Sequence, residues 1–167
     1  MGTRRHATIA TVIGGLTLVA DGDQVVGCHF PPTDTSTLGD PVAPGDDPLL
    51  GRAAQQVGEY LEGTRVSFDL PLRTEGDDFQ ERVWAALREI PFGTTVSYGD
   101  VATGLGDPAL ARRVGRAVGQ NPIGVIIPCH RVIGADGSLT GFGGGLERKR
   151  QLLELEEPAE VREARLF

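Results

Sequence analysis

The chain has 167 residues, a hydrophobic fraction of 40% and a formal net charge of -7 at pH 7. A chain of this length can bury a core without disulfides, as one domain or as two small ones. No apolar run approaches the roughly 18 residues that a membrane-spanning helix needs, so we expect a cytoplasmic protein and no membrane partner. The acidic balance argues against a protein that coats nucleic acid with its whole surface.

The two cysteines, Cys28 and Cys129, lie in different sequence settings. Two cysteines do not make the disulfide framework of a small secreted protein, but thiol chemistry stays open. With Cys129 and His130 set aside, a zinc ion could draw only on Cys28, His29 and His6. We therefore expect no metal site.

The first part of the chain alternates short apolar runs with turns. Three runs, over 7–13, 16–20 and 25–30, predict a three-strand meander. A stretch rich in Pro, Gly, Asp and Thr follows and predicts a mobile loop, and apolar residues at helical spacing over 48–63 predict a helix. Residues 66–70 could form another strand. We expect an N-terminal α+β domain over residues 1–74.

The character changes near Thr74, and we expect a mainly helical second domain over residues 75–167. Residues 78–90 place their apolar side chains on one face, open with Asp78 and Glu81, and are followed by Pro91, which is typical of a helix.

Two further short helices are predicted from their capping residues. Ser97, with Asp100 three residues later, predicts the start of one helix. Asp107 and Pro108 predict the start of the next, which should end near Gly119.

The helix that begins near Pro108 has two different faces. Its apolar residues share one side, Arg112 and Arg116 fall on the opposite side, and Arg113 lies at the flank. From 108 to 150 the chain carries seven basic residues against two acidic ones. Two short helices with outward arginines on the second are typical of a helix-turn-helix, although such arginines can also be a solvated face.

After these helices come Asn121-Pro122, an apolar run over 123–127 that predicts a buried strand, and the sequence PCHRVIGADG. Adjacent Cys129 and His130 after such a run are unlike a small core cysteine. A lone Cys-His pair is nevertheless more often structural than chemical, so the pair alone leaves both interpretations open.

Three stretches together resemble a known family: FQERVWAALREIPFGTTVSYGDVA, DPALARRVGRAVGQNP and IIPCHRVIGADGSLTGFGGGLERKRQLLELE. They resemble the O6-alkylguanine-DNA alkyltransferases, also called methylated-DNA–protein-cysteine methyltransferases, roughly from Phe79 to Glu156. The resemblance implies an α+β fold, with a ribonuclease H-like strand and helix domain followed by a mainly helical domain with a helix-turn-helix. It implies no cofactor. The expected partner is double-stranded DNA containing O6-alkylguanine, bound by a monomer, with assembly along DNA left open.

The resemblance also implies catalytic roles. Cys129 would accept the alkyl group, because displacement at an sp³ carbon suits a thiolate. His130 would take the thiol proton through a water, and Glu156 would orient His130. The hydroxyl of Tyr98 would assist protonation of the guanine ring N3 as the leaving group departs.

DNA recognition is implied for a second set of residues. A stacked base cannot react, so the alkylated guanine must be flipped out, and Arg112 would fill its place. Arg113 and Arg116 would contact phosphates. The proposed pocket residues are Val132, Phe142, Gly143 and Asn121; Asn121 would also tie the recognition helix to the active-site turn.

The sequence departs from the family pattern at a few positions. Phe142 stands where the family usually has Tyr, Gly143 and Gly144 extend a glycine-rich loop, and Val118 stands where many bacterial members carry Asn. These departures concern substrate range and rate rather than the nucleophile. The preferred alkyl group, and activity on O4-alkylthymine, stay open.

Three alternatives differ from this interpretation. An alkyltransferase-like protein that binds lesions without repair would lack the acceptor cysteine, which this chain has. A thiol hydrolase would need direct contact between Cys129 and His130, which adjacent residues of an extended segment do not favour. A transcriptional helix-turn-helix protein would leave the PCHRV sequence without a role.

Overall fold

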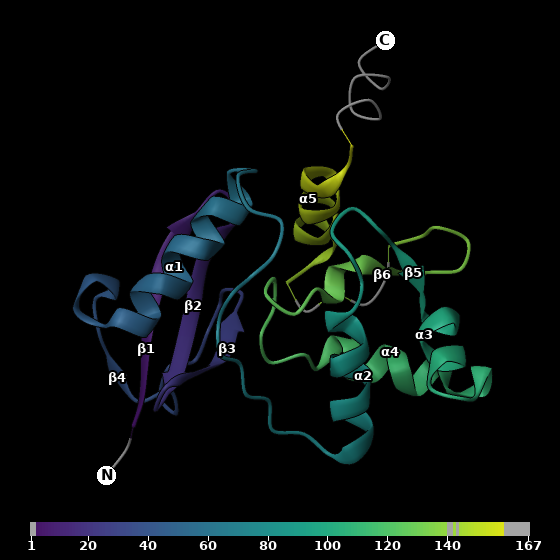
Figure 1. Ribbon diagram of the computed structural model, residues 1–167, viewed down its shortest axis with the longest axis horizontal. Helices are drawn as coiled ribbons and strands as arrows, with labels where there is room; N and C mark the ends of the chain where they lie inside the picture. Colours follow the sequence, from purple (N-terminus) through teal and green to yellow (C-terminus); the bar gives the residue numbers. More distant parts are fainter. Residues whose placement is uncertain (1–2, 140–141, 143, 159–167) are drawn as a thin grey trace. The chain divides into compact units, whose positions relative to one another are not determined.

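The computed structural model describes residues 3–139, 142 and 144–158 (Figure 1). The chain forms two compact units, one from Met1–Glu75 with Pro122–Ile126 and the other from Gly76–Asn121 with Ile127–Phe167. The first is rich in strands and the second is mainly helical, so the expected α+β class is confirmed. No helix within the described residues is long and apolar enough to cross a membrane.

The first unit is built on an antiparallel meander, as predicted. Its elements are β1 (Arg4–Thr11), β2 (Gly14–Asp21), β3 (Gln24–His29), β4 (Asp40–Pro41), the 3₁₀ turn η1 (Pro44–Asp46) and α1 (Pro48–Leu61). The sheet order is β3-β2-β1-β4, and β4 pairs with β1 in parallel. β2 is central and its residues from Leu16 to Ala20 are all buried. α1 packs on this sheet through one apolar face (Figure 1).

Helix α1 begins at a well-defined cap. The carboxylate of Asp47 accepts hydrogen bonds from the backbone N–H groups of Leu49 and Leu50, and Pro48 occupies the first helical position. Asp47 also pairs with Arg5 on β1, which ties the helix start to the sheet. These contacts explain why helix and meander form one unit.

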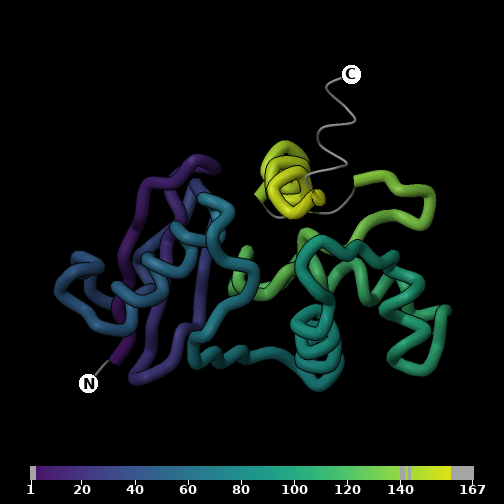
Figure 2. Tube along the Cα trace, turned by 45° about the horizontal axis from the view of Figure 1, so that its top comes forward, coloured from purple at the N-terminus to yellow at the C-terminus, as the bar shows by residue number. Residues whose placement is uncertain are grey.

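Two sequence expectations for this unit were wrong. Residues 66–70 form no strand, and the chain instead meets the sheet through a single bridge between Leu72 and Val25. The apolar run over 123–127 is not a strand either. Ile123 makes one bridge to Cys28, and the chain then turns (Figure 2 follows its path).

The turn after Ile123 is unusually tight. Ile126 N donates to Gly124 O at 2.7 Å, and Val125 between them has φ 67°. This is the strained form of the three-residue γ-turn, in a backbone region that β-branched residues rarely adopt. Gly124 lies where a side chain would meet the ring of Phe30. Ile123 and Val125 are both buried, and burial of apolar side chains opposes the cost of a strained backbone.

The second unit consists mainly of short helices. Its elements are α2 (Asp78–Arg88), β5 (Val96–Ser97), α3 (Tyr98–Gly104), the 3₁₀ turn η2 (Pro108–Leu110), α4 (Ala111–Gly119), the 3₁₀ turn η3 (Cys129–Arg131), β6 (Val132–Ile133) and α5 (Leu146–Glu156). β5 and β6 pair in parallel. The two strands bring the start of α3 next to the residue that follows η3.

The helix starts match the predicted capping chemistry with small shifts. Ser97 and Asp100 form a reciprocal capping box at the start of α3, as expected. At α2 the box is made by Asp77 and Gln80, one residue earlier than the predicted Asp78 and Glu81. Asp107 caps the 3₁₀ turn η2, and the α-helical conformation begins only at α4.

Candidate active site

Cys129 follows a sharp change of chain direction. Pro128 has φ -80° and ψ 65°, and Cys129 N donates to Ile127 O at 2.8 Å, which is an inverse γ-turn. Cys129, His130 and Arg131 then form the 3₁₀ turn η3. Their side chains are buried in the second unit although each belongs to a polar or reactive type.

The Cys129 thiol lies in a closed environment, with the residue 4% exposed. Burial raises the pKa of Cys129, whereas a hydrogen bond from the Asn121 side chain and the positive charge of Lys149 act against that rise. Asn121 Nδ2 also donates to Ile127 O at 2.9 Å, so it joins the end of α4 to the turn before the cysteine. A thiolate at Cys129 would therefore be stabilised by the Asn121 hydrogen bond and by the positive charge of Lys149.

His130 is paired with a carboxylate. His130 Nε2 lies 2.7 Å from Glu156 Oε2, and the side chains are 0% and 2% exposed. Burial lowers the pKa of His130, the hydrogen bond and charge of Glu156 raise it, and the charges of Arg131 and Lys149 lower it further. The imidazole is therefore held in its neutral form near pH 7, in which it can accept a proton.

Arg131 holds the other side of the same carboxylate. Its Nε and Nη2 lie 2.8 and 2.9 Å from Glu156 Oε1 and Oε2, and its Nη1 donates to Ile90 O at 2.6 Å. Gly93 N also donates to Glu156 Oε1 at 3.2 Å. Glu156 thus accepts from an arginine fork, a backbone amide and a histidine.

Helix α5 supplies two of the buried charges. Lys149, Leu152 and Glu156 are spaced three and four residues apart and are the buried residues of this helix. Lys149 Nζ donates to Val132 O at 2.6 Å. Burial lowers the pKa of Lys149 and the Cys129 thiolate raises it.

Tyr98 lies near this buried lysine. Lys149 Nζ is 5.8 Å from the centroid of the Tyr98 ring. Tyr98 is the first residue of α3 and is partly exposed, and its ring lies close to Gly115 of α4. The structure thus brings Cys129, His130, Glu156 and Lys149 together, with Tyr98 on the Lys149 side.

The three predicted DNA-binding arginines lie on α4 and are all exposed. The opposite face of the helix is buried through Val114, Ala117 and Val118, as its periodicity predicted.

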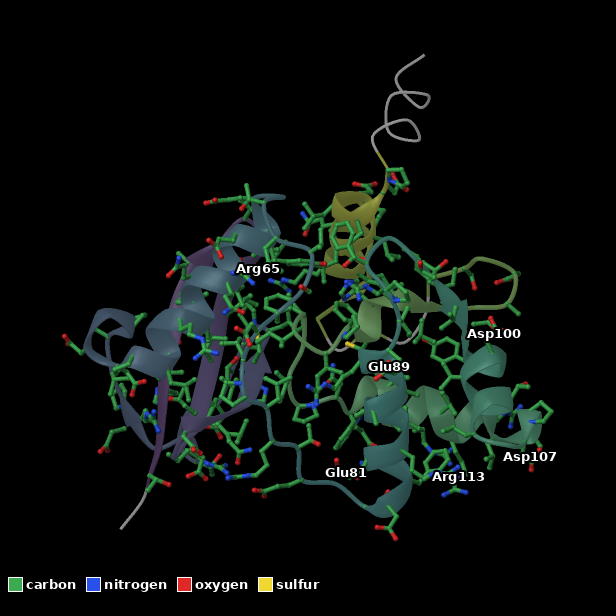
Figure 3. The ribbon with its side chains drawn as sticks, viewed as in Figure 1. Arg65, Glu81, Glu89, Asp100, Asp107 and Arg113 are labelled. Carbon is green, nitrogen blue, oxygen red and sulfur yellow. The ribbon has the colours of Figure 1, made fainter. Side chains whose placement is uncertain are left out.

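Arg113 is held by a contact that the sequence did not reveal. Its guanidinium carbon lies 4.1 Å from the centroid of the Phe79 ring on α2. Arg113 is labelled in Figure 3. Trp84 of α2 donates to Ala117 O at 2.8 Å and fixes the same pair of helices.

The basic surface is smaller than the count along the sequence indicated. Arg131 and Lys149 are buried, and Arg150 pairs with Glu147 and Glu154. These three residues therefore add little to an outward basic surface, which leaves mainly Arg112, Arg113 and Arg116 on α4, with the half-buried Arg148 on α5.

The remaining predicted pocket residues are placed only in part. Val132 is fully buried after η3, and Phe142 O accepts a hydrogen bond from Gly145 N at 3.0 Å. Gly143 lies outside the described residues. Across the part of the chain that the structure describes, no three His, Cys, Asp or Glu side chains gather as metal ligands would.

Sequence reasoning missed two charged residues of the site, Arg131 and Lys149. A signal was present for each. Arg131 directly follows the Cys-His pair, and Lys149 precedes Glu156 by seven residues, which is two turns of a helix. Both were counted as surface charge, because burial of a basic side chain depends on partners distant in sequence.

Comparison with known proteins gives a consistent result over both parts of the chain. Residues 5–74 match the family model described as 6-O-methylguanine DNA methyltransferase, ribonuclease-like domain. Residues 78–158 match the model described as 6-O-methylguanine DNA methyltransferase, DNA binding domain.

Individual relatives agree with the domain matches. A methylated-DNA–protein-cysteine methyltransferase of Mycobacterium tuberculosis is 44% identical over 97% of this chain and 98% of its own length. The inducible protein of that name from Bacillus subtilis is 50% identical over 68% of this chain and 64% of its own length. The solved M. tuberculosis OGT in complex with DNA aligns with a TM-score of 0.84, 44% identity, and coverage of 94% of this chain and 97% of that one.

A ribonuclease-like domain followed by a DNA-binding domain defines the class of protein. This chain belongs to the 6-O-methylguanine DNA methyltransferase family, which confirms the resemblance seen in the sequence.

Proposed function

We propose that this DNA repair methyltransferase removes the alkyl group from O6-alkylguanine in double-stranded DNA by transferring it, once and irreversibly, to Sγ of Cys129. The observation that carries the proposal is the buried His130–Glu156 pair beside a thiol that has Asn121 and Lys149 as its partners. A cysteine that only packs in a core needs no buried histidine–carboxylate pair and no buried lysine beside it, and burial of such groups costs free energy. Family membership supports the same assignment.

The reaction is a displacement at carbon. The thiol proton of Cys129 passes to His130, by way of a water, and Glu156 stabilises the imidazolium that forms. The thiolate then attacks the alkyl carbon, a new S–C bond forms, and the C–O6 bond breaks with its electron pair going to the guanine. Proton uptake at ring N3 neutralises the leaving guanine, and the hydroxyl of Tyr98 assists this step. The product on the protein is a thioether.

DNA recognition is assigned to α4. Arg112 takes the place of the flipped nucleotide in the base stack, and Arg116 contacts a phosphate. Arg113, which lies across the Phe79 ring, approaches the backbone in a fixed direction. Asn121 connects this helix to the cysteine turn, so that docking of α4 and the position of Cys129 are coupled.

The substrate pocket is assigned to the backbone of Cys129, Val132 and Gly143, with Phe142 in its wall. Because Phe142 lacks the hydroxyl that the family usually has, we expect a less polar wall. We further propose that the protein acts as a monomer in the cytoplasm. Its partner is the duplex that carries the lesion.

The test is mass spectrometry of the protein after mixing with a duplex that contains O6-methylguanine. The expected result is one methyl group on the peptide with Cys129 and none on the peptide with Cys28. Cys28 is the matched control, because it too is buried. Cys129→Ser should lose transfer and keep DNA binding, whereas Cys28→Ala should keep both. Binding without transfer by the folded wild type would instead identify a lesion-binding protein.

A further inference from the structure

Arg131 contacts the acid of the proposed thiol-activating pair without contacting the thiol. Its fork closes on both oxygens of Glu156, while His130 takes a third hydrogen bond to one of them. Glu156 and Arg131 are both buried, and Arg131 is anchored at its far end by Ile90 O. Arg131 is therefore a fixed part of the buried site and not a surface counter-ion.

The position of Arg131 has an electrostatic consequence. A buried carboxylate alone raises the pKa of a neighbouring histidine and favours imidazolium, and a protonated histidine cannot accept the thiol proton. The guanidinium shares the charge of Glu156, and its field opposes protonation of His130. Consistent with this, the pKa of His130 is lowered, first by burial and in part by the charge of Arg131.

We propose that Arg131 is a positioning residue that orients the Glu156 carboxylate and keeps the His130–Glu156 pair able to accept a proton at neutral pH. The inference rests on the proposed function, because it assigns His130 as the proton acceptor. With Glu156 ionised, His130 Nε2 carries the proton that Glu156 accepts, and Nδ1 is the nitrogen that receives the next one.

Within the described residues, the named groups near His130 come from three segments of the chain. From η3 come Cys129 and Arg131, and from α5 come Lys149 and Glu156. The segment after α2 contributes Ile90 O to Arg131 and Gly93 N to Glu156. Removal of Arg131 leaves Glu156 with Lys149 as the remaining named cation near the histidine. Because one positive charge is lost, proton uptake by the His130–Glu156 pair should move to higher pH.

The experiment measures the rate of methyl transfer to Cys129 against pH in wild type, Arg131→Met and Arg131→Lys. We call the part of the profile in which the transfer rate falls toward low pH the acid limb. In Arg131→Met the acid limb should shift to higher pH by about one unit or more, since one unit is a ten-fold change in proton affinity. In Arg131→Lys the limb should stay near that of wild type, because the positive charge remains, although the rate falls with loss of the fork.

A role in packing alone gives a different result. It would reduce the rate of folded Arg131→Met by the same factor at every pH and leave the limb unmoved, which would overturn the inference. If Arg131→Met does not fold, nitrogen NMR of wild-type His130 decides. A neutral imidazole protonated at Nε2 between about pH 6 and 8 supports the inference, and an imidazolium in that range overturns it.

The two proposals fail in different ways. No methyl transfer to Cys129 by folded wild-type protein at any pH would refute the proposed function. Transfer by wild type with an unmoved limb in Arg131→Met would refute only the role of Arg131. Arg150→Met on α5 is the control for loss of a positive charge, since Arg150 pairs with Glu147 and Glu154 and lies outside the His130–Glu156 pair.

Discussion

His130 Nε2 lies 2.7 Å from Glu156 Oε2, with both side chains buried. The two residues are 26 positions apart in the sequence, and the contact depends on α5 placing its last residue against η3. In the proposed mechanism, this contact supports His130 as the base that accepts the Cys129 thiol proton.

Glu156→Gln and His130→Gln should slow transfer at pH 7 by about 10²-fold or more, the usual contribution of a positioned base. Burial raises the pKa of Cys129, so without the base little thiolate forms at neutral pH, and the rate should recover as pH rises toward that pKa. Transfer rates against pH, with Glu154→Gln as the neighbouring control, test this. A folded variant that alkali does not help would point to a packing role.

Arg112→Ala should weaken repair of duplex lesions far more than reaction with a free O6-alkylguanine base. The reason is that a residue filling the vacated stack has no task when the base is already free. Paired rate measurements on the two substrates are the check, with the exposed Arg88→Ala of α2 as control. Equal losses on both substrates would remove Arg112 from this role.

Binding to undamaged duplex should weaken steeply with salt. Each phosphate contact contributes about 0.9 to the magnitude of the slope of log affinity against log salt. Loss of one contact in Arg116→Ala should therefore lower that magnitude by about 0.9. Phe79→Leu should weaken binding to undamaged duplex in the same assay, because it removes the ring against which Arg113 lies. An unchanged slope in Arg116→Ala would show that this arginine does not reach the backbone.

The free energy of unfolding should fall as pH drops below about 6.5, the ordinary pKa of histidine. Burial lowers the pKa of His130 and of His29, so the unfolded chain binds protons that the folded chain does not. This stability is present above that pH and is lost below it. Urea unfolding of wild type, His130→Gln and His29→Gln between pH 5 and 8 measures how much each histidine contributes to the pH dependence of the free energy of unfolding. A profile that keeps its wild-type slope in both variants would contradict the assignment.

Much of the fold could be predicted from the sequence because local chemistry determines it. The alternation before His29 predicted the meander, and Ser97 with Asp100 predicted the start of α3. The run before Pro128 was misinterpreted as a strand, since apolar content does not reveal a γ-turn at Val125. That conformation is held by burial and by a close approach to Phe30, which are tertiary effects.

The site was predictable only where a sequence motif carried it. The resemblance located Cys129, His130 and Glu156, and the structure places the last two in contact. Arg131 and Lys149 looked like surface charges because each is buried by partners from other elements, Ile90 O for one and Val132 O for the other. A buried charge is recognisable only when its partners are known.

The most direct test of the central claim is the stoichiometry of repair. In the proposed reaction the product on Cys129 is a thioether, an unactivated sulfide, so we expect each molecule to act once. With excess O6-methylguanine duplex, repaired product should rise to one equivalent per protein and stop, in step with the methyl group appearing on Cys129. Continued turnover beyond one equivalent would contradict the account and indicate a hydrolase.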